Sequence, residues 1–328
     1  MIAFMSNYLY TNPIKFRVVD DIETAKSMWE YSSPHEEIDD DWNFRYAFYK
    51  YLKFPLHFIA GYHDHKPVGL LPLQWNTGKG PTPESYEFKK NFIEFFGGDD
   101  MDSNKVFVKP GYEDLIPAFL QQINEPAVLA PLASPYMIAN HTPEAYTTKY
   151  IADLKDMTEF RDFTTKYFDG KGRGKLNNQL SKLYRSYEIK IEDAKAEDLE
   201  MLFDYNKERF GETSSFQWEY RKQVFRDLMS QYDHDVFKVV INGDTKAISF
   251  SLLYKKTYLS MNIGYDYAIR DLGKLVVSTQ FERAIKLKSE LYDGGKGDSG
   301  WKEQFHLDKI PQYRLTIPSA LNAHVVYR

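Results

Sequence analysis

Hydrophobic and polar positions are most regular between residues 235 and 293. The apolar run 235–241 is followed by Asn242-Gly243, a strong signal for a two-residue hairpin turn, and then by β-branched and aromatic residues at 245–254. A polar pair then precedes residues 257–266, in which polar and apolar residues alternate with the period of a half-buried strand. The pattern therefore predicts a three-stranded antiparallel meander.

The residues after the meander change to helical spacing. Within 274–290, Val277, Phe281, Ala284 and Leu287 recur at intervals that place them near one face of a helix. A short strand is expected next, at Leu291-Tyr292-Asp293. The order meander, helix and returning strand is specific enough to compare with known folds.

Three further helices are expected before the meander. Residues 196–210 and 218–232 each carry an apolar face. Residues 175–187 form an amphipathic basic helix, which we expect to follow a flexible Gly-Lys-Gly-Arg-Gly lead. Basic side chains surround its apolar face: Lys171, Arg173, Lys175, Lys182 and Arg185.

The first half contains a weaker copy of the same pattern. His57–Tyr62 and residues 67–75 read as a strand, turn and strand around a polar turn. A length of 328 residues is also a soft prior for two domains. We therefore expect a duplicated unit, with one domain at residues 1–160 and the second at 161–328.

Composition narrows the class of protein. The composition, with 43% hydrophobic, 16% aromatic and 27% charged residues, is typical of a folded globular protein. It contains no Cys, which excludes disulfides, thiol catalysis and zinc sites built on cysteine. No run approaches about 20 apolar residues, so we expect a cytoplasmic protein with no membrane insertion. His63-x-His65 lacks nearby partners, and no metal is predicted.

Charge is distributed unevenly around a net formal value of −5. Acidic residues exceed basic ones in residues 1–160, whereas basic residues exceed acidic ones in 161–328. A long anionic ligand would therefore be attracted to the second half.

The loop between the third meander strand and the following helix contains Arg270-x-x-Gly273-Lys274. A glycine at a helix start lets backbone N–H groups approach an anion, and the helix dipole favours negative charge there. Meander, Arg-x-x-Gly, helix and strand together resemble the acyl-CoA N-acyltransferase (GNAT) superfamily. The resemblance implies that Arg270, Gly273 and Lys274 hold donor phosphates. In the family motif, a third small residue lets the pyrophosphate lie close to the backbone. This sequence has Leu275 at that position.

A second motif runs from Asp293 through Gly297 to Trp301, Lys302 and Phe305. It resembles the Asp-x-x-x-Gly-x-x-x-Tyr-Lys-x-x-Phe/Trp signature of the CelD-like branch, which is related to the Fem-type aminoacyltransferases. Those families contain two tandem acyltransferase-like folds. The resemblance therefore implies an α/β protein with two tandem GNAT-like domains, built from mixed, mainly antiparallel sheets flanked by helices.

The resemblance also implies roles for single residues. Lys302 would stabilise the reacting carbonyl or a substrate phosphate. Asp293 and Asp266 are candidates for removing the proton of an attacking amine. Arg173 and Trp301 are assigned to substrate binding.

These features predict an N-acyltransferase that moves an acyl group from an activated donor, most simply acyl-CoA, to a primary amine of an amino acid, peptide or amino sugar. One alternative keeps the fold and takes an aminoacyl-tRNA as donor, with the basic helix 171–185 contacting RNA phosphates. A second alternative is a non-catalytic binding protein on a decayed transferase fold.

Overall fold

The computed structural model describes residues 13–80, 82, 88–136, 141–298 and 300–318. The chain forms two compact units, one of residues 1–147 with 311–328 and one of residues 148–310. Each unit is described by itself. Their boundaries differ from the predicted division at 160/161, since the first unit includes the end of the chain. The assignment of one GNAT-like domain to each half of the sequence stays a prediction.

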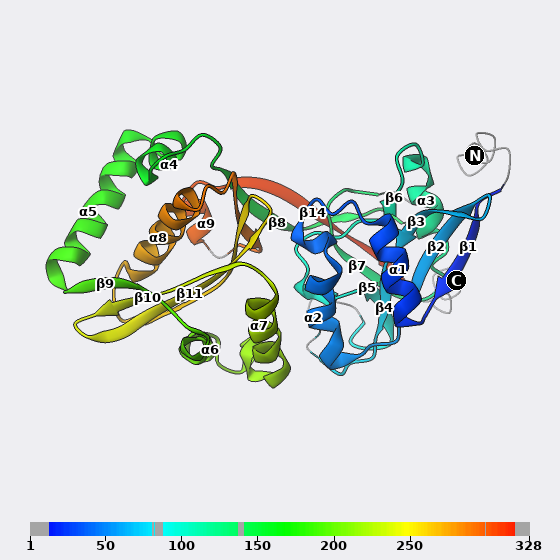
Figure 1. The fold of residues 1–328 in the computed structure, drawn as a ribbon, viewed down its shortest axis with the longest axis horizontal. Coiled ribbons are helices and arrows are strands. Elements are labelled where there is room, and N and C mark those ends of the chain that lie inside the picture. The colour runs from blue at the N-terminus through cyan, green and yellow to red at the C-terminus, as the bar shows by residue number, and fades with distance from the viewer. Residues whose placement is uncertain (1–12, 81, 83–87, 137–140, 299, 319–328) are drawn as a thin grey trace, which may run out of the picture. The chain divides into compact units, whose positions relative to one another are not determined.

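The second unit contains one sheet in the order β8-β13-β12-β11-β10-β9, with helices on both faces (Figure 1). Strands β10, β11 and β12 form the predicted meander, and β13 returns parallel to β12. Helix α8 lies on one face of this sheet and α6 on the other (Figure 1). Its elements are β8 (Glu144–Asp153, entering the unit at Thr148), α4 (Phe160–Tyr167), α5 (Gly170–Ser186), β9 (Ile189–Asp193), α6 (Leu199–Phe210), α7 (Glu219–Gln231), β10 (His234–Ile241), β11 (Asp244–Tyr254), β12 (Thr257–Tyr265), α8 (Leu272–Lys286), β13 (Leu291–Lys296) and α9 (Trp301–Gln304).

The residues of its two turns explain why the meander could be predicted from the sequence. Asn242 and Gly243 both have positive φ, 52° and 91°, the backbone conformation that a type I′ hairpin turn requires. Lys255, in the second turn, also has a positive φ of 53°. The predicted strands and the predicted helix between β12 and β13 are confirmed.

Two local predictions are wrong. Residues 170–174, expected as a flexible lead, form the first turns of α5, because the Asp169 carboxylate caps the helix by accepting a hydrogen bond from the Gly172 N–H at 2.6 Å. The alternation along β12 also does not continue to Asn262, because the pairing with β11 shifts at Met261. Ser260 and Asn262 therefore lie on opposite faces of the sheet.

The core of the second unit is rich in aromatic rings from α4, α8 and β13. Phe281 stacks on Phe163 at a centroid distance of 3.9 Å and on Tyr292 at 4.1 Å, and all three side chains are buried.

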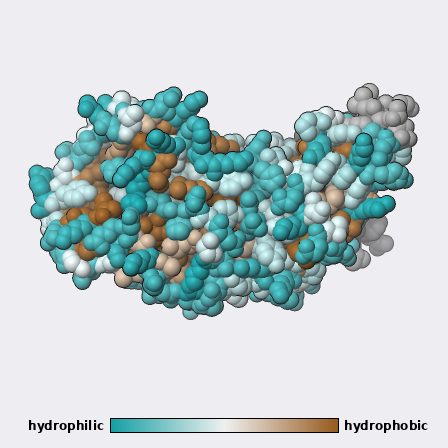
Figure 2. Space-filling model, in the orientation of Figure 1, coloured by the Kyte–Doolittle hydropathy of each residue, from teal (hydrophilic) through white to brown (hydrophobic). Residues whose placement is uncertain are grey.

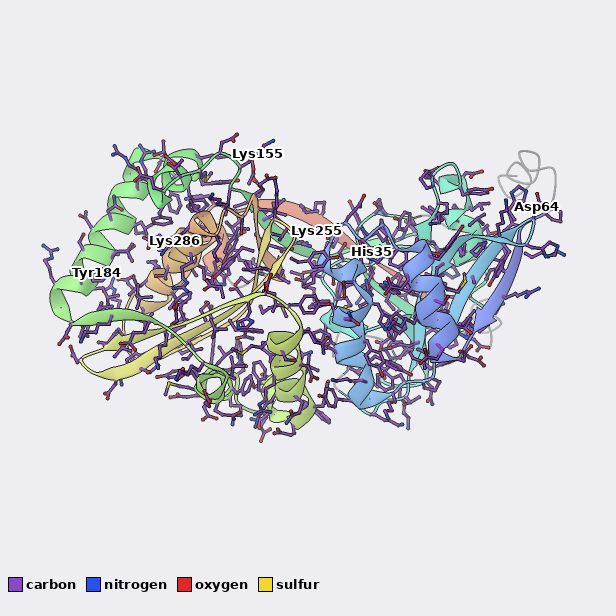
Figure 3. All side chains as sticks on the ribbon, in the orientation of Figure 1. His35, Asp64, Lys155, Tyr184, Lys255 and Lys286 are labelled. Carbon is purple, nitrogen blue, oxygen red and sulfur yellow. The ribbon has the colours of Figure 1, made fainter. Side chains whose placement is uncertain are left out.

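The surface is mostly polar. Figure 2 shows one face of the molecule, on which apolar patches lie between polar areas. Lys155 and Lys286, labelled in Figure 3, are exposed.

The element order of the first unit resembles that of the second. Both contain a strand, two helices, a hairpin, a further strand, a helix and a strand that pairs in parallel: β5 with β7 here, and β12 with β13 in the second unit. The first unit adds the short strands β4 and β6 to this order. The hairpin predicted from His57–Tyr62 is β2 and β3. The elements are β1 (Lys15–Val19), α1 (Ile22–Ser32), η2 (Ile38–Asp40), α2 (Trp42–Leu52), β2 (Phe58–His63), β3 (Lys66–Leu71), β4 (Leu73–Asn76), β5 (Phe92–Phe95), η3 (Gly98–Asp100), β6 (Phe107–Val108), α3 (Ile116–Leu120), β7 (Ala127–Leu132) and β14 (Asp308–Ile317, entering the unit at Pro311).

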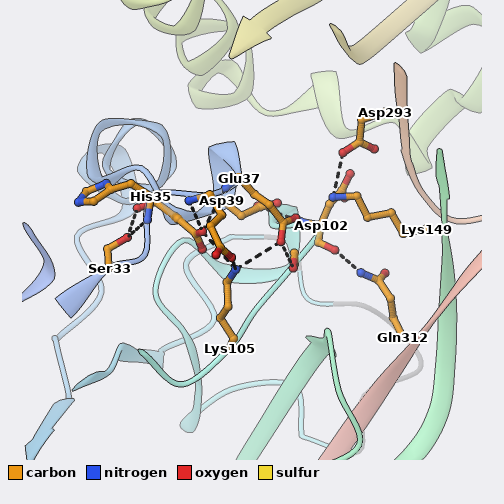
Figure 4. A network of polar contacts seen from close by, with 12 residues as sticks. Ser33, His35, Glu37, Asp39, Asp102, Lys105, Lys149, Asp293 and Gln312 are labelled. Carbon is orange, nitrogen blue, oxygen red and sulfur yellow. Dashed lines mark hydrogen bonds and ion pairs between the residues drawn. The ribbon is translucent and has the colours of Figure 1, made fainter. Parts of the chain in front are cut away.

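The first unit also has a charged interior. The Arg45 side chain is fully buried and donates hydrogen bonds to the backbone oxygens of Phe96 and Ser103 and to Asn104 Oδ1. Lys105 lies among acidic side chains, with its Nζ 3.1 Å from Asp40 Oδ2 (Figure 4). The buried guanidinium of Arg45 is thus satisfied by hydrogen bonds, and the ammonium of Lys105 by an ion pair, as burial of charge requires.

Together these observations confirm the predicted fold class. The protein is mixed α/β, with sheets that combine antiparallel and parallel pairs and are flanked by helices.

Candidate active site

Strands β12 and β13 separate shortly after they pair. Their parallel pairing covers Thr257↔Leu291 to Leu259↔Asp293, yet β12 continues to Tyr265 and β13 to Lys296. A β-bulge at Met261 disturbs the pairing of β12 with β11 at the same level. Backbone N–H and C=O groups that lose their strand partner need another one. This fork, the point beyond Leu259 and Asp293 where the strands part, is the candidate site for a ligand.

Asp293 is the last paired residue before the fork. Its side chain is buried, and its Oδ2 lies 2.8 Å from the Nζ of Lys149, which is also buried (Figure 4). Its Oδ1 accepts a hydrogen bond from the Gly295 N–H at 2.9 Å. The predicted Asp293 is therefore held at the fork by a buried ion pair and by a backbone N–H near the end of β13.

Lys302 is buried with only 5% of its surface exposed. Its ammonium donates hydrogen bonds to three consecutive backbone oxygens, those of Gly295, Lys296 and Gly297, at 3.0, 2.7 and 2.8 Å. The Nζ also lies 5.3 Å from the ring centroid of Tyr150, close enough for a cation–π contact. Lys302 therefore fixes the end of β13 and the start of the glycine-rich loop that leads to α9.

Trp301 covers the same loop. Its side chain is partly buried, and its ring lies near Gly294, where an added Cβ would stand 3.5 Å from the indole Cη2. The structure thus brings together three predicted residues, Asp293, Trp301 and Lys302, around one loop beside the fork.

Asp266 lies at the opposite end of β12. It is seven positions beyond Leu259, which corresponds to a distance on the order of 20 Å along a strand. Its carboxylate accepts a hydrogen bond from the Ala268 N–H at 3.0 Å and lies 3.7 Å from Lys246 Nζ. It caps a turn there, and the structure does not bring Asp266 and Asp293 together.

The predicted phosphate-binding residues gather around an acidic side chain at the start of α8. Asp271 Oδ1 accepts hydrogen bonds from Lys274 Nζ at 2.9 Å and from Gln179 Nε2 at 3.0 Å. Arg270 Nε is 3.6 Å from Asp271 Oδ2, and the Arg270 side chain is 87% exposed. The positive end of this helix therefore already has a carboxylate beside it.

The backbone near the start of α8 is also covered. A Cβ added at Gly273 would lie 2.7 Å from the ring of Tyr265, so the glycine permits close packing of this aromatic side chain. Leu275, which replaces a small residue of the family motif, is buried in an apolar cluster with Leu272 and Val276. Both residues serve packing within the protein.

Arg173 contacts the connection between α4 and α5. Its Nη1 donates hydrogen bonds to the backbone oxygens of Phe168 at 3.1 Å and Thr165 at 3.5 Å. These contacts join two helices, and the structure shows no contact of Arg173 with the fork.

Sequence reasoning missed Lys149 and a buried polar cluster behind the fork. Gln280, fully buried on α8, accepts a hydrogen bond from the Tyr292 hydroxyl at 2.6 Å and donates to Ser249 Oγ at 2.8 Å and Ser260 Oγ at 3.1 Å. Burial raises the pKa of Tyr292 well above its ordinary value, so the phenol stays a neutral donor. A glutamine within the apolar face of a predicted helix was the available signal.

No helix among the described residues is both long and apolar enough to span a bilayer. In the same part of the chain, no cluster of three or more His, Asp or Glu side chains is arranged to hold a metal ion.

Comparisons with known proteins concern the family of one part of the chain and the fold of the whole. Residues 170–303 match the family model described as acetyltransferase (GNAT) domain. No curated protein sequence matches the chain. Among solved structures, FemX superposes with a TM-score of 0.60 and 10% identity over 96% of this chain and 100% of its own.

Two other solved structures show the same likeness. A tandem GNAT protein from the clavulanic acid biosynthesis pathway gives a TM-score of 0.52 at 10% identity, covering 94% of this chain and 99% of that one. L-PGS from Bacillus licheniformis gives 0.51 at 10% identity, covering 94% and 96%. At these identities the likeness concerns the fold. Residues 170–303 therefore resemble a GNAT acetyltransferase domain, and the chain shares its fold with FemX and with a tandem GNAT protein.

Proposed function

We propose that the protein is an N-acyltransferase that acts at the fork between β12 and β13. The observation that carries the proposal is the separation of the two strands directly beyond Leu259 and Asp293, within a GNAT-type domain. In the reaction, the nitrogen of a primary amine forms a bond to the acyl carbon of an activated donor. The bond from that carbon to the leaving sulfur or oxygen breaks, and the proton lost by the amine ends on that leaving atom, which departs as a thiol or an alcohol.

The strands supply rigid hydrogen-bond donors for this step. Backbone N–H groups of β12 beyond Leu259 are not paired with β13, and the bulge at Met261 loosens their pairing with β11. Donors that are fixed before the reaction stabilise the negative charge that develops on a carbonyl oxygen. The acyl carbonyl is placed at this part of β12.

Lys302, Asp293 and Lys149 act as positioning residues. The three carbonyls bound to Lys302 hold the loop, and the Asp293–Lys149 ion pair holds β13 against β8. Asp266 is partly exposed, and its role as a base stays a prediction. For Asp266 to act as the base, the amine must bind near the end of β12.

Coenzyme A is the donor to test first. In a thermal-shift titration, coenzyme A and acetyl-CoA should each stabilise the protein. At a ligand concentration 100 times the dissociation constant, the free energy of unfolding should rise by about 2.7 kcal/mol. Arg270→Ala should weaken the shift, whereas Arg161→Ala, an exposed arginine on α4, should not. The carboxylate of Asp271 predicts that Asp271→Asn tightens binding, because it removes a negative charge beside the phosphates. No shift with either ligand would contradict acyl-CoA as the donor.

Aminoacyl-tRNA is the second candidate donor, favoured by the surface of α5. Four of its basic side chains are exposed and form no ion pair with any described residue: Lys171, Lys175, Lys182 and Arg185. RNA binding through such contacts should weaken with salt, with a slope of log K of about −0.7 to −0.9 per phosphate contact. A Lys175→Glu, Lys182→Glu variant should reduce that slope, with Lys155→Glu as the control. Binding without salt dependence would contradict this donor, and failure of both donors would favour the non-catalytic alternative.

A further inference from the structure

The bulge in β12 turns one polar side chain toward the face of α6. Before the bulge, Ser260 contacts Gln280 of α8. After the bulge, Asn262 contacts Asn206 of α6, and Gly264 packs against the same helix, where an added Cβ would stand 2.9 Å from the Leu202 oxygen. Met261 is the extra residue that causes this reversal.

A chain of hydrogen bonds fixes the orientation of the Asn262 amide. The Ser214 hydroxyl donates to Asn206 Oδ1 at 2.8 Å, so the other end of the Asn206 amide must be its NH₂ group. That group donates to Asn262 Oδ1 at 3.3 Å. Asn206 and Ser214 are both buried, at 8% and 3% exposure, which protects the chain from competition by water.

This order leaves the NH₂ group of Asn262 as a donor. Within the part of the chain that the structure describes, Asn262 Nδ2 has no hydrogen-bond partner. The side chain is partly exposed and lies three residues beyond Leu259, on the α6 side of the fork. An oriented amide donor at this place is suited to bind an oxygen with free lone pairs.

We propose that Asn262 binds a carbonyl oxygen of the amine acceptor, which makes the acceptor an amino acid amide or a peptide. The inference rests on the proposed acyl transfer at the fork. Asn206 and Ser214 are positioning residues, because they act through Asn262. An amine without a neighbouring carbonyl lacks the oxygen that this amide recognises.

The first test follows the Asn262 side chain directly. In protein labelled with ¹⁵N-asparagine, the NH₂ signals of Asn262 are identified by their loss in Asn262→Ala. Glycinamide should shift these signals, and ethylamine, which has the amine but no carbonyl, should not. The exposed Asn178 provides reference signals that neither probe should move. Unmoved Asn262 signals with glycinamide would overturn the inference.

The second test compares acetyl transfer from acetyl-CoA to the two amines. Wild type should prefer glycinamide, and Asn262→Ala should lower its kcat/KM for glycinamide about tenfold, the effect of one hydrogen bond, without changing that for ethylamine. Ser214→Ala should reduce the same preference and Ser214→Thr should restore it. A preference that is as large in Asn262→Ala as in wild type would overturn the inference. Shifted signals without transfer to either amine would contradict acyl-CoA-dependent transfer alone.

Discussion

Lys149 Nζ lies 2.8 Å from Asp293 Oδ2, and both side chains are at least nine-tenths buried. The two residues come from neighbouring antiparallel strands, β8 and β13, in a pairing that skips from Asp293 to Lys296 opposite Lys149. Asp293 lies opposite Ile151, and Lys149, two residues along β8, is on the same face, so its long side chain reaches the carboxylate diagonally. Removing one partner of such a pair leaves an uncompensated buried charge, whereas removing both does not.

Lys149→Met should therefore lower the free energy of unfolding by about 3–5 kcal/mol. The double variant Lys149→Met, Asp293→Leu should recover much of that loss, because no lone charge remains. Urea denaturation measures both. Lys155→Met, at an exposed position, is the control and should change stability by less than about 0.5 kcal/mol. Equal losses in the single and double variants would contradict the ion pair as the cause.

Lys302→Ala should destabilise the second unit by about 3 kcal/mol, because three inward-facing carbonyls lose their donor. Lys302→Arg should restore little, since a planar guanidinium cannot occupy the place of a compact ammonium. Lys309→Ala removes an exposed lysine paired with Glu303 and should cost at most about 1 kcal/mol. Chemical denaturation of the three variants distinguishes these effects. If Lys302→Ala lowered the free energy of unfolding no more than Lys309→Ala does, Lys302 would not be what fixes this backbone.

Two glycines should respond in opposite directions to alanine. Gly273→Ala places a methyl group against the Tyr265 ring and should cost about 1–3 kcal/mol of stability. Gly174→Ala, within α5 and with open space around its Cβ, should stabilise by about 0.4–1 kcal/mol. Thermal or urea unfolding measures both. Stabilisation by Gly273→Ala would show that the Tyr265 ring moves aside.

Glu94, in the first unit, should make stability depend on pH. Burial raises the pKa of its carboxyl to about 7, against hydrogen bonds from Gln74 and Asn76, and the charges of Asp99 and Asp100 raise this pKa further. The folded state therefore binds the proton more tightly than the unfolded state does. This contribution, about 3 kcal/mol, is fully present below the unfolded pKa near 4.5 and is lost as pH rises toward 7.

Glu94→Gln should remove this loss, because a glutamine cannot ionise and the two neighbouring amides can rotate to match it. Urea midpoints at pH 5, 6, 7 and 8 should fall in wild type and stay flatter in the variant. Glu125→Gln, at an exposed position, should follow the wild type. Parallel profiles for wild type and Glu94→Gln would contradict a protonated Glu94.

The sequence by itself determined the meander, the following helix and the fold class. These elements depend on local chemistry: the Asn242-Gly243 turn, the alternation within each strand and the apolar face around Phe281. Turn type and hydrophobic periodicity act over a few residues, so they are readable from one sequence. Three residues of the motif, Asp293, Trp301 and Lys302, lie together around one loop in the structure.

Only the tertiary structure decided which predicted residues meet. Lys149 gave no sequence signal, because its partner Asp293 is distant in the chain and meets it only through the pairing of β8 with β13. The bulge at Met261 moved Asn262 to the opposite face, although a period of two predicted otherwise. Packing and strand register bring distant residues into contact, and local sequence patterns do not encode them individually.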